Sequence, residues 1–147
     1  MQSLAPRLGV IGAVMLGAFL LQGCGGNAGN LQVGDCFDEP LEVSDTVLDV
    51  ENRLCTEPHD AEVVFVGDYT PGSEIYPEDE QFLTFFETAC TPAFNTYTGL
   101  DYVTDPTYEI SAYTPTAEGW TDDDDRKVIC YAVRLDGEKM TASIRKP

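Results

Sequence analysis

The five cysteines and the single histidine are the residues of this chain best suited to chemistry. Cys24, Cys36, Cys55, Cys90 and Cys130 are well separated in the sequence. No two of them have the two-residue gap of a zinc knuckle or a redox pair, and one histidine cannot complete several metal sites. We therefore expect no metal site and no cofactor.

His59 lies in a polar turn between Pro58 and Asp60, and Glu62 follows two positions later. One interpretation is a general base, a metal ligand or a pH-sensitive contact with carboxylate support. The other is a structural ring that hydrogen-bonds backbone in a turn and positions the next strand. We favour the structural interpretation, because a lone histidine without a partner nucleophile is a poor catalytic set.

Nucleophiles for an enzymatic reaction are scarce. The serines after the N-terminal region occur in no recognisable nucleophile motif; they are Ser44, Ser73, Ser111 and Ser143. Glycoside cleavage needs only two carboxylates, but the chain has 26 Asp and Glu residues, so their presence identifies no pair. We expect no enzyme, and keep an envelope hydrolase using His59 or a carboxylate pair as the least favoured hypothesis.

A second group of candidate residues surrounds the acidic run Asp122–Asp125. The run offers oxygen ligands for calcium, yet it lacks the alternating spacing and the glycine of a known calcium loop, so a solvated loop is the simpler interpretation. Trp120 is either a ligand-stacking residue or, as we favour, a core or loop anchor. Arg126 can pair with the aspartates or orient the turn.

Composition and charge limit the class of protein. The 147 residues carry a formal charge of −18, with 8 Lys and Arg, and 43% of them are hydrophobic. An acidic surface is repelled by phosphate backbones, which excludes nucleic acid as a partner. The hydrophobic content supports a packed core, and the length suits one domain.

The N-terminal region has the layout of a signal peptide. Arg7 precedes an apolar run from Leu8 to Leu21 that is too short to span a membrane. The ending Leu21, Gln22, Gly23, Cys24 resembles the lipobox of bacterial lipoproteins, in which the cysteine receives a diacylglyceryl group and becomes the new N-terminus. The alternative is an ordinary secretory signal with a chance cysteine.

Lipidation would fix the location of the protein. We expect a signal peptide over residues 1–23, a lipidated Cys24 with a flexible tether over residues 24–32, and a folded domain over residues 33–147. Two or more acyl chains anchor a protein stably, so we expect it at the extracytoplasmic face of the cell membrane.

The remaining four cysteines predict disulfides in an oxidising compartment. Four cysteines allow three connectivities. We predict Cys36 with Cys55 and Cys90 with Cys130.

Hydrophobic patterns predict the elements that must position these residues. The predicted strands cover residues 47–54, 61–69, 108–113 and 127–135, and a turn at Asp136 and Gly137 leads to a further strand over residues 140–144. Pro77 and three acidic residues begin a helix, whose face carries Phe82, Phe85, Phe86, Ala89 and Cys90.

The helix should end or kink at Thr91 and Pro92, with a further turn through Phe94 and Tyr97 before Gly99. Strands on both sides of one principal helix indicate an α+β domain with a mostly antiparallel sheet. The Cys90–Cys130 disulfide would then fix the helix to this sheet.

Three short motifs follow one another along the chain: Val33 to Phe37, then Cys55 to Val64 with Pro58 and His59, then Trp120 with Asp125 to Cys130. Their order resembles the septum formation family of actinobacterial membrane-attached proteins. The resemblance spans residues 33–145 and implies an exported domain with a role around cell division. Asp124 replaces the glycine of the family's Gly-Asp-Arg element, so we expect a loop of different shape there.

These observations lead to three functional hypotheses. The first is a non-enzymatic lipoprotein that binds another envelope or division protein, with His59, Glu62, Trp120, Asp125 and Arg126 as candidate interaction residues. The second is capture of a cation or small ligand by the acidic surface around Asp122–Asp125. The third is the envelope hydrolase.

Overall fold

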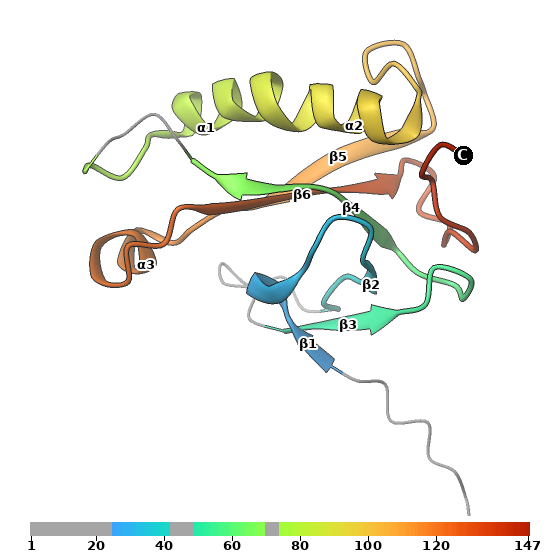
Figure 1. Ribbon diagram of the computed structural model, residues 1–147, viewed down its shortest axis with the longest axis horizontal. Helices are drawn as coiled ribbons and strands as arrows, with labels where there is room; N and C mark the ends of the chain where they lie inside the picture. Colours follow the sequence, from blue (N-terminus) through green and yellow to red (C-terminus); the bar gives the residue numbers. More distant parts are fainter. Residues whose placement is uncertain (1–24, 42–48, 70–73) are drawn as a thin grey trace, which may run out of the picture.

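The computed structural model describes residues 25–41, 49–69 and 74–147, which form an antiparallel sheet and one long helical layer (Figure 1). Within these residues the sheet has six strands in the order β1-β3-β2-β4-β6-β5. The strands are β1 (Gly25–Asn27), β2 (Cys36–Asp38), β3 (Asp49–Arg53), β4 (Ala61–Asp68), β5 (Tyr108–Tyr113) and β6 (Lys127–Arg134). The expected α+β class with a mostly antiparallel sheet is confirmed.

Three of the five helical segments in the described residues form one continuous stretch. The five segments are the 3-10 helix η1 (Ala28–Asn30), α1 (Asp79–Phe85), the π-helical η2 (Phe86–Cys90), α2 (Thr91–Thr98) and α3 (Ala117–Asp122). In Figure 1, the stretch from α1 to α2 covers β4, β5 and β6, while β1, β2 and β3 lie on the opposite side of these strands.

The long helix begins within the predicted acidic residues and ends at Thr98, before Gly99, as expected. Glu78 forms a capping box with Gln81, and Asp79 and Glu80 add negative charge to the first turn. The helix does not end at Thr91 and Pro92: a π-helical turn precedes them, and the expected further turn through Phe94 and Tyr97 follows. The π-helical turn, in which Thr91 N donates to Phe86 O, leads into the first turn of α2, where the missing N–H of Pro92 is tolerated.

The three longest strands match their predictions closely. Strand β5 covers the predicted residues, β4 ends one residue earlier than predicted, and so does β6. The expected strand over residues 140–144 is wrong. Gly137 does make the turn, with φ +73°, but only Met140 pairs, and it forms an isolated bridge with His59 instead of a hairpin with β6.

The folded part of the chain begins before Val33. Gly25–Asn27 pair with β3, and Ala28 and Leu31 are buried. Part of the expected flexible tether therefore forms a short edge strand. Gly26 in this strand lies against the side chain of Asn52, which leaves no room for a Cβ atom. Residue 24 and those before it lie outside the described residues.

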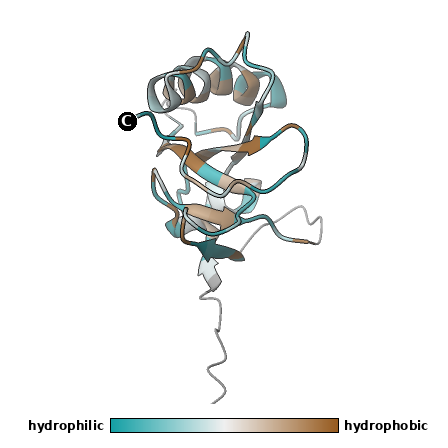
Figure 2. Cartoon of the chain, turned by 90° about the vertical axis from the view of Figure 1, so that its right-hand side faces the viewer, coloured by the Kyte–Doolittle hydropathy of each residue, from teal (hydrophilic) through white to brown (hydrophobic). Residues whose placement is uncertain are grey.

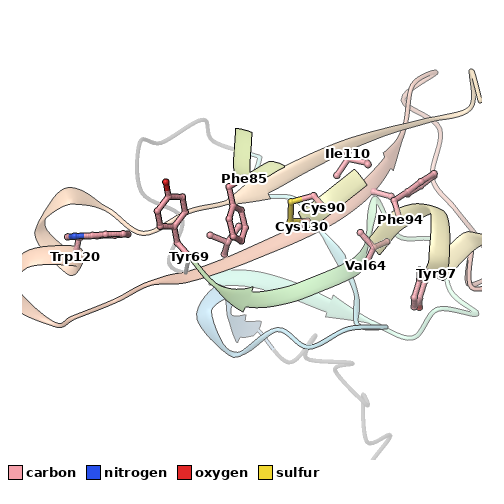
Figure 3. Close-up of a cluster of buried hydrophobic side chains, with 11 residues drawn as sticks. Val64, Tyr69, Phe85, Cys90, Phe94, Tyr97, Ile110, Trp120 and Cys130 are labelled. Atoms are coloured by element: carbon pink, nitrogen blue, oxygen red, sulfur yellow. A yellow bond between two sulfur atoms is a disulfide. The ribbon is translucent and has the colours of Figure 1, made fainter. Parts of the chain in front are cut away.

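Two hydrophobic clusters lie on opposite faces of the sheet. The cluster beneath the long helix contains Val64, Phe85, Phe94, Ile110 and Trp120, several of them labelled in Figure 3. The other cluster lies between the central strands and β1 to β3, around Phe37, Val63 and Tyr131. Hydrophobic residues accordingly concentrate in the central strands and the helix (Figure 2).

Both predicted disulfides are present. Cys36 bonds to Cys55, and Cys90 bonds to Cys130, with Cα atoms 5.3 Å and 5.8 Å apart. Cys90 and Cys130 are completely buried, so this disulfide joins the helix to β6 within the core. The expectation that it fixes the helix to the sheet is confirmed.

Candidate functional site

His59 is buried in the turn that precedes β4. Its Nδ1 lies 2.7 Å from the carbonyl oxygen of Glu57, and its backbone pairs with Met140, with N···O distances of 3.0 Å and 2.8 Å. The side chain is 0% exposed, and its Nε2 has no hydrogen-bond partner among the described residues. The structural interpretation of His59 is confirmed, because the ring holds a turn and the backbone holds the C-terminal segment.

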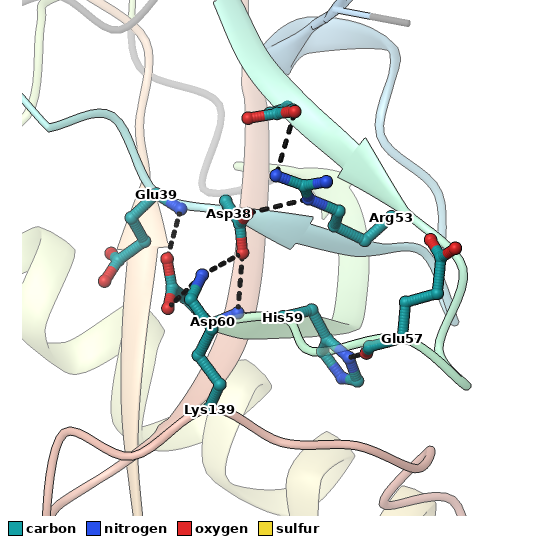
Figure 4. A network of polar contacts seen from close by, with 8 residues as sticks. Asp38, Glu39, Arg53, Glu57, His59, Asp60 and Lys139 are labelled. Carbon is teal, nitrogen blue, oxygen red and sulfur yellow. Dashed lines mark hydrogen bonds and ion pairs between the residues drawn. The ribbon is translucent and has the colours of Figure 1, made fainter. Parts of the chain in front are cut away.

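The residues beside His59 form a cluster of ion pairs (Figure 4). Asp38 accepts hydrogen bonds from Arg53 Nε at 2.7 Å and from Lys139 Nζ at 2.6 Å. Lys139 also contacts Asp60 at 3.0 Å. Burial alone would raise the pKa of Asp38, but the hydrogen bonds and charges of Lys139 and Arg53 outweigh it and hold this pKa below its ordinary value.

Glu62 is a completely buried carboxylate in β4. Its Oε1 accepts hydrogen bonds from Tyr97 Oη at 2.5 Å and from Ser143 Oγ at 2.6 Å, and its Oε2 accepts one from Ile144 N at 2.8 Å. Burial, with the hydrogen bond to Glu62 and its charge, raises the pKa of Tyr97 to about 12. Glu62 thus joins β4, α2 and the C-terminal segment, and is not open to a substrate.

Trp120 and Arg126 form the second group of candidate residues. Trp120 is 2% exposed and meets Tyr69 and Tyr76 edge to face, with centroids 5.7 Å and 5.8 Å away. The Arg126 guanidinium lies 3.7 Å from the centre of its ring and donates to Trp120 O at 2.8 Å. Trp120 is therefore a core anchor, as the favoured interpretation predicts, and Arg126 orients the following turn.

The acidic run forms an exposed loop above this anchor. Asp124 pairs with Arg126 at 2.9 Å, and Asp125 caps the start of β6 by accepting a hydrogen bond from Lys127 N. Asp124 adopts φ +53°, so aspartate keeps a positive φ at the position where the family has glycine. Aspartate tolerates the left-handed region better than most residues, because its short polar side chain can pair locally.

A cleft of about 760 Å³ opens between this loop, η1 and the end of β5. Its lining includes Asp68, Tyr113, Asp123, Asp124 and Lys127. Lys127 Nζ crosses it to donate to Gly29 O at 2.9 Å. Of the predicted interaction residues, Asp125 and Arg126 both line this cleft. His59 and Glu62 lie elsewhere, under the C-terminal segment.

A search for metal-ligating groups among the described residues gives one set, Cys36, Cys55 and Glu62. The two sulfurs of that set are bonded to each other, and the carboxylate already accepts three hydrogen bonds. This set therefore does not fit a metal ion. None of the helices described is long and apolar enough to cross a membrane.

Comparison with known protein families identifies the family of this chain. A family model described as septum formation matches residues 27–143, which is most of the chain. The chain belongs to the septum formation family. The match begins six residues before Val33, in agreement with the early start of the fold. Searches of curated proteins and of solved structures gave no match.

The motifs that carry the family resemblance have clear structural roles in this septum formation domain. The Cys55-to-Val64 motif supplies one disulfide, the His59 turn and the buried Glu62. The Trp120-to-Cys130 motif supplies the aromatic anchor, the arginine above it and the second disulfide. The residues of these motifs therefore stabilise the fold of the domain.

Sequence reasoning missed the partners of Glu62. Tyr97 is 35 residues away in the chain and Ser143 is 81 residues away, so no local pattern connects them. One signal was present: Glu62 interrupts the apolar run of β4, and a charge within a buried strand requires partners.

Proposed function

We propose that this septum formation domain is a non-enzymatic binding module that holds a protein partner of the cell envelope or division machinery. The observation that carries the proposal is the burial of its only histidine and of a nearby carboxylate. His59 and Glu62 are both 0% exposed and committed to backbone and side-chain partners, so they support packing rather than catalysis. The family match to septum formation gives the biological setting.

We further propose that the domain lies outside the cytoplasm, attached to the membrane by lipid on Cys24. The two disulfides support an oxidising compartment, since such bonds persist mainly in exported proteins. The sequence Leu21 to Cys24 supports the anchor. Mass spectrometry of the native protein tests it: an acylated residue 24 is expected, and an unmodified cysteine there would contradict it.

Crosslinking in whole cells, followed by affinity purification of the full chain, tests the binding role. We expect one envelope or division protein to be enriched over a matched lipoprotein of similar abundance. Equal recovery of all proteins in the two samples would contradict the proposal.

A second candidate function is cation or small-ligand capture in the cleft beside Asp123, Asp124 and Asp125. The observation that favours it is the volume of about 760 Å³, together with the acidic lining. Calorimetry with calcium chloride tests its simplest form. Heat that disappears on Asp123→Asn substitution would support it, and no heat at millimolar calcium would contradict it.

A further inference from the structure

The most unusual surface among the described residues is the free edge of β5 beside an apolar groove. Strand β5 is the last in the strand order and pairs only with β6 among the described strands. The groove, about 240 Å³ in volume, lies between the long helix and this strand, and its lining includes Phe82, Leu83, Phe86 and Ala112. Ala112 therefore belongs to both features.

The backbone groups of β5 that face outward can be assigned from its pairing with β6. Leu135 N donates to Thr107 O at 3.0 Å, just beyond the strand, and the register is regular from Tyr108 to Tyr113. Because hydrogen-bonded and non-hydrogen-bonded pairs alternate in an antiparallel ladder, Tyr108, Ile110 and Ala112 direct their N–H and C=O groups to the open edge.

Natural proteins usually protect an exposed strand edge from pairing with another chain, and β5 has few of the features that do so. The strand contains no lysine and no proline, and its pairing with β6 has no bulge. Leu83, at the groove, is 58% exposed. An added strand would lie about 4.8 Å from β5, and its alternate side chains on the helix side would enter the groove.

The charge of the segments around β5 and the groove indicates what kind of partner segment fits there. Residues 74–125, which supply α1, η2, α2, β5 and α3, contain 13 Asp and Glu and no Lys, Arg or His. Glu87 on the helix and Glu109 on β5 are both exposed. A partner segment with basic flanks is therefore favoured over an acidic one or over a second copy of this acidic domain.

We infer that β5 and the adjoining groove bind an extended segment of a partner protein by strand addition. The segment has about six residues that alternate apolar and polar side chains, with Lys or Arg at its flanks. Main-chain hydrogen bonds to Ile110 and Ala112 supply affinity, and the groove selects the apolar side chains. This inference rests on the proposed binding function and assigns its surface.

The probe for the test is a synthetic peptide, Lys-Lys-Val-Thr-Val-Thr-Val-Lys-Lys, added to the isotope-labelled full chain. We expect NMR shifts centred on Ile110, Ala112 and the groove, slower exchange of those two amides, and weaker binding as salt screens the charges. A peptide with Glu in place of Lys should bind about tenfold more weakly. Shifts located elsewhere, or none at millimolar peptide, would overturn the inference.

Matched variants separate the groove from general effects. Leu83→Lys places a charge on the groove wall and should weaken the peptide about tenfold. Leu54→Lys is the control, because Leu54 is 67% exposed and lies after β3, away from the groove; it should change affinity less than twofold. Ala112→Pro removes an outward N–H and should also weaken binding. Equal affinities for Leu83→Lys and Leu54→Lys would overturn the assignment.

Cell crosslinking with the same variants distinguishes this inference from the proposed function. If the native chain captures a partner and Leu83→Lys captures it equally, the binding role stands and the assigned surface is wrong. If the native chain captures none, the binding role itself fails. Sedimentation showing a dimer that Ala112→Pro dissociates would assign the edge to a second copy and overturn the basic partner.

Discussion

At the scale of single residues, the C-terminal segment depends on the hydrogen bonds that Glu62 accepts. A hydrogen bond to a buried carboxylate contributes more than one between neutral groups. Ser143→Ala should lower the free energy of unfolding by about 1.5–3 kcal/mol, because Glu62 loses the donor at 2.6 Å. Urea unfolding measures this change.

Thr141→Ala is the control for Ser143, since Thr141 is exposed in the same segment. It should change stability by less than about 0.5 kcal/mol. Similar losses of unfolding free energy for the two variants would show that any side-chain truncation destabilises the segment. The hydrogen bond to Glu62 would then have no specific effect.

Tyr97 should make stability fall at alkaline pH. Its folded pKa of about 12 lies above the ordinary value of 10.0, so between these pH values the folded chain keeps a proton that the unfolded chain loses. Because the unfolded state then binds fewer protons, the free energy of unfolding decreases as pH rises from 10 to 12.

The variant Tyr97→Phe isolates this contribution from those of the other tyrosines. It should be less stable than the native chain near neutral pH, because Glu62 loses the donor Tyr97 Oη. The difference should become smaller as pH rises above 10, when only the native chain has Tyr97 to titrate. Urea unfolding at neutral pH and near pH 11 measures it, and a constant difference would contradict the assignment.

At the scale of elements, the disulfides should differ in their contributions. Cys90–Cys130 closes a separation of 40 residues and joins two buried sites, whereas Cys36–Cys55 closes 19 and Cys55 is only partly buried. Replacing either pair with alanine should cost about 2–5 kcal/mol, with the larger loss for Cys90 and Cys130. Urea unfolding of the two double variants provides the comparison, and the reverse order would contradict it.

The elements that were predicted well have strong local signals. β-Branched and aromatic residues mark β4 and β6, and the acidic start and repeated phenylalanines mark α1. The failures depend on tertiary structure. Met140 pairs with the distant His59, and the π-helical turn before Pro92 fits a helix that must bring both Cys90 and Phe94 into the core.

The candidate sites were predictable only in part for the same reason. The sequence marks His59, Trp120 and Arg126, and their structural roles follow from burial and local hydrogen bonds. The groove beside β5 had no sequence signal. It exists because the order of the strands leaves β5 at an edge and places α1 and η2 beside it.

At the scale of the whole molecule, charge is divided unevenly along the chain. The last 22 residues, 126–147, hold six of the eight Lys and Arg, while residues 54–125 hold none. The cations therefore lie mainly in or beside β6 and in the C-terminal segment, where Arg126 pairs with Asp124 and Lys139 pairs with Asp38. The helical layer and β5 contain no cation of their own, although Arg145 contacts Tyr97 and Arg134 lies opposite Tyr108. The resulting excess of negative charge disfavours contact with anionic lipid and favours basic partners.

The position of β1 implies how an anchored domain would face its membrane. Strand β1 starts at Gly25, directly after Cys24, so lipid on Cys24 would leave almost no tether. β1 would then lie beside the lipid head groups, while the helical layer above β5, on the opposite side of the molecule in Figure 1, would face away and remain open to a partner. In vesicles carrying a paramagnetic head-group label, the amides of Asn27 and Asn30 should broaden more than those of Glu87 and Glu109.

A flexible insert provides the control for this orientation. About ten Gly and Ser residues placed between Cys24 and Gly25 would keep the lipid anchor but let the domain move about 2 nm from the surface. The broadening of Asn27 and Asn30 should then decrease, while membrane binding stays unchanged because it depends on the acyl chains alone. Equal broadening with and without the insert would mean that the domain binds the membrane through its own surface, which its negative charge opposes.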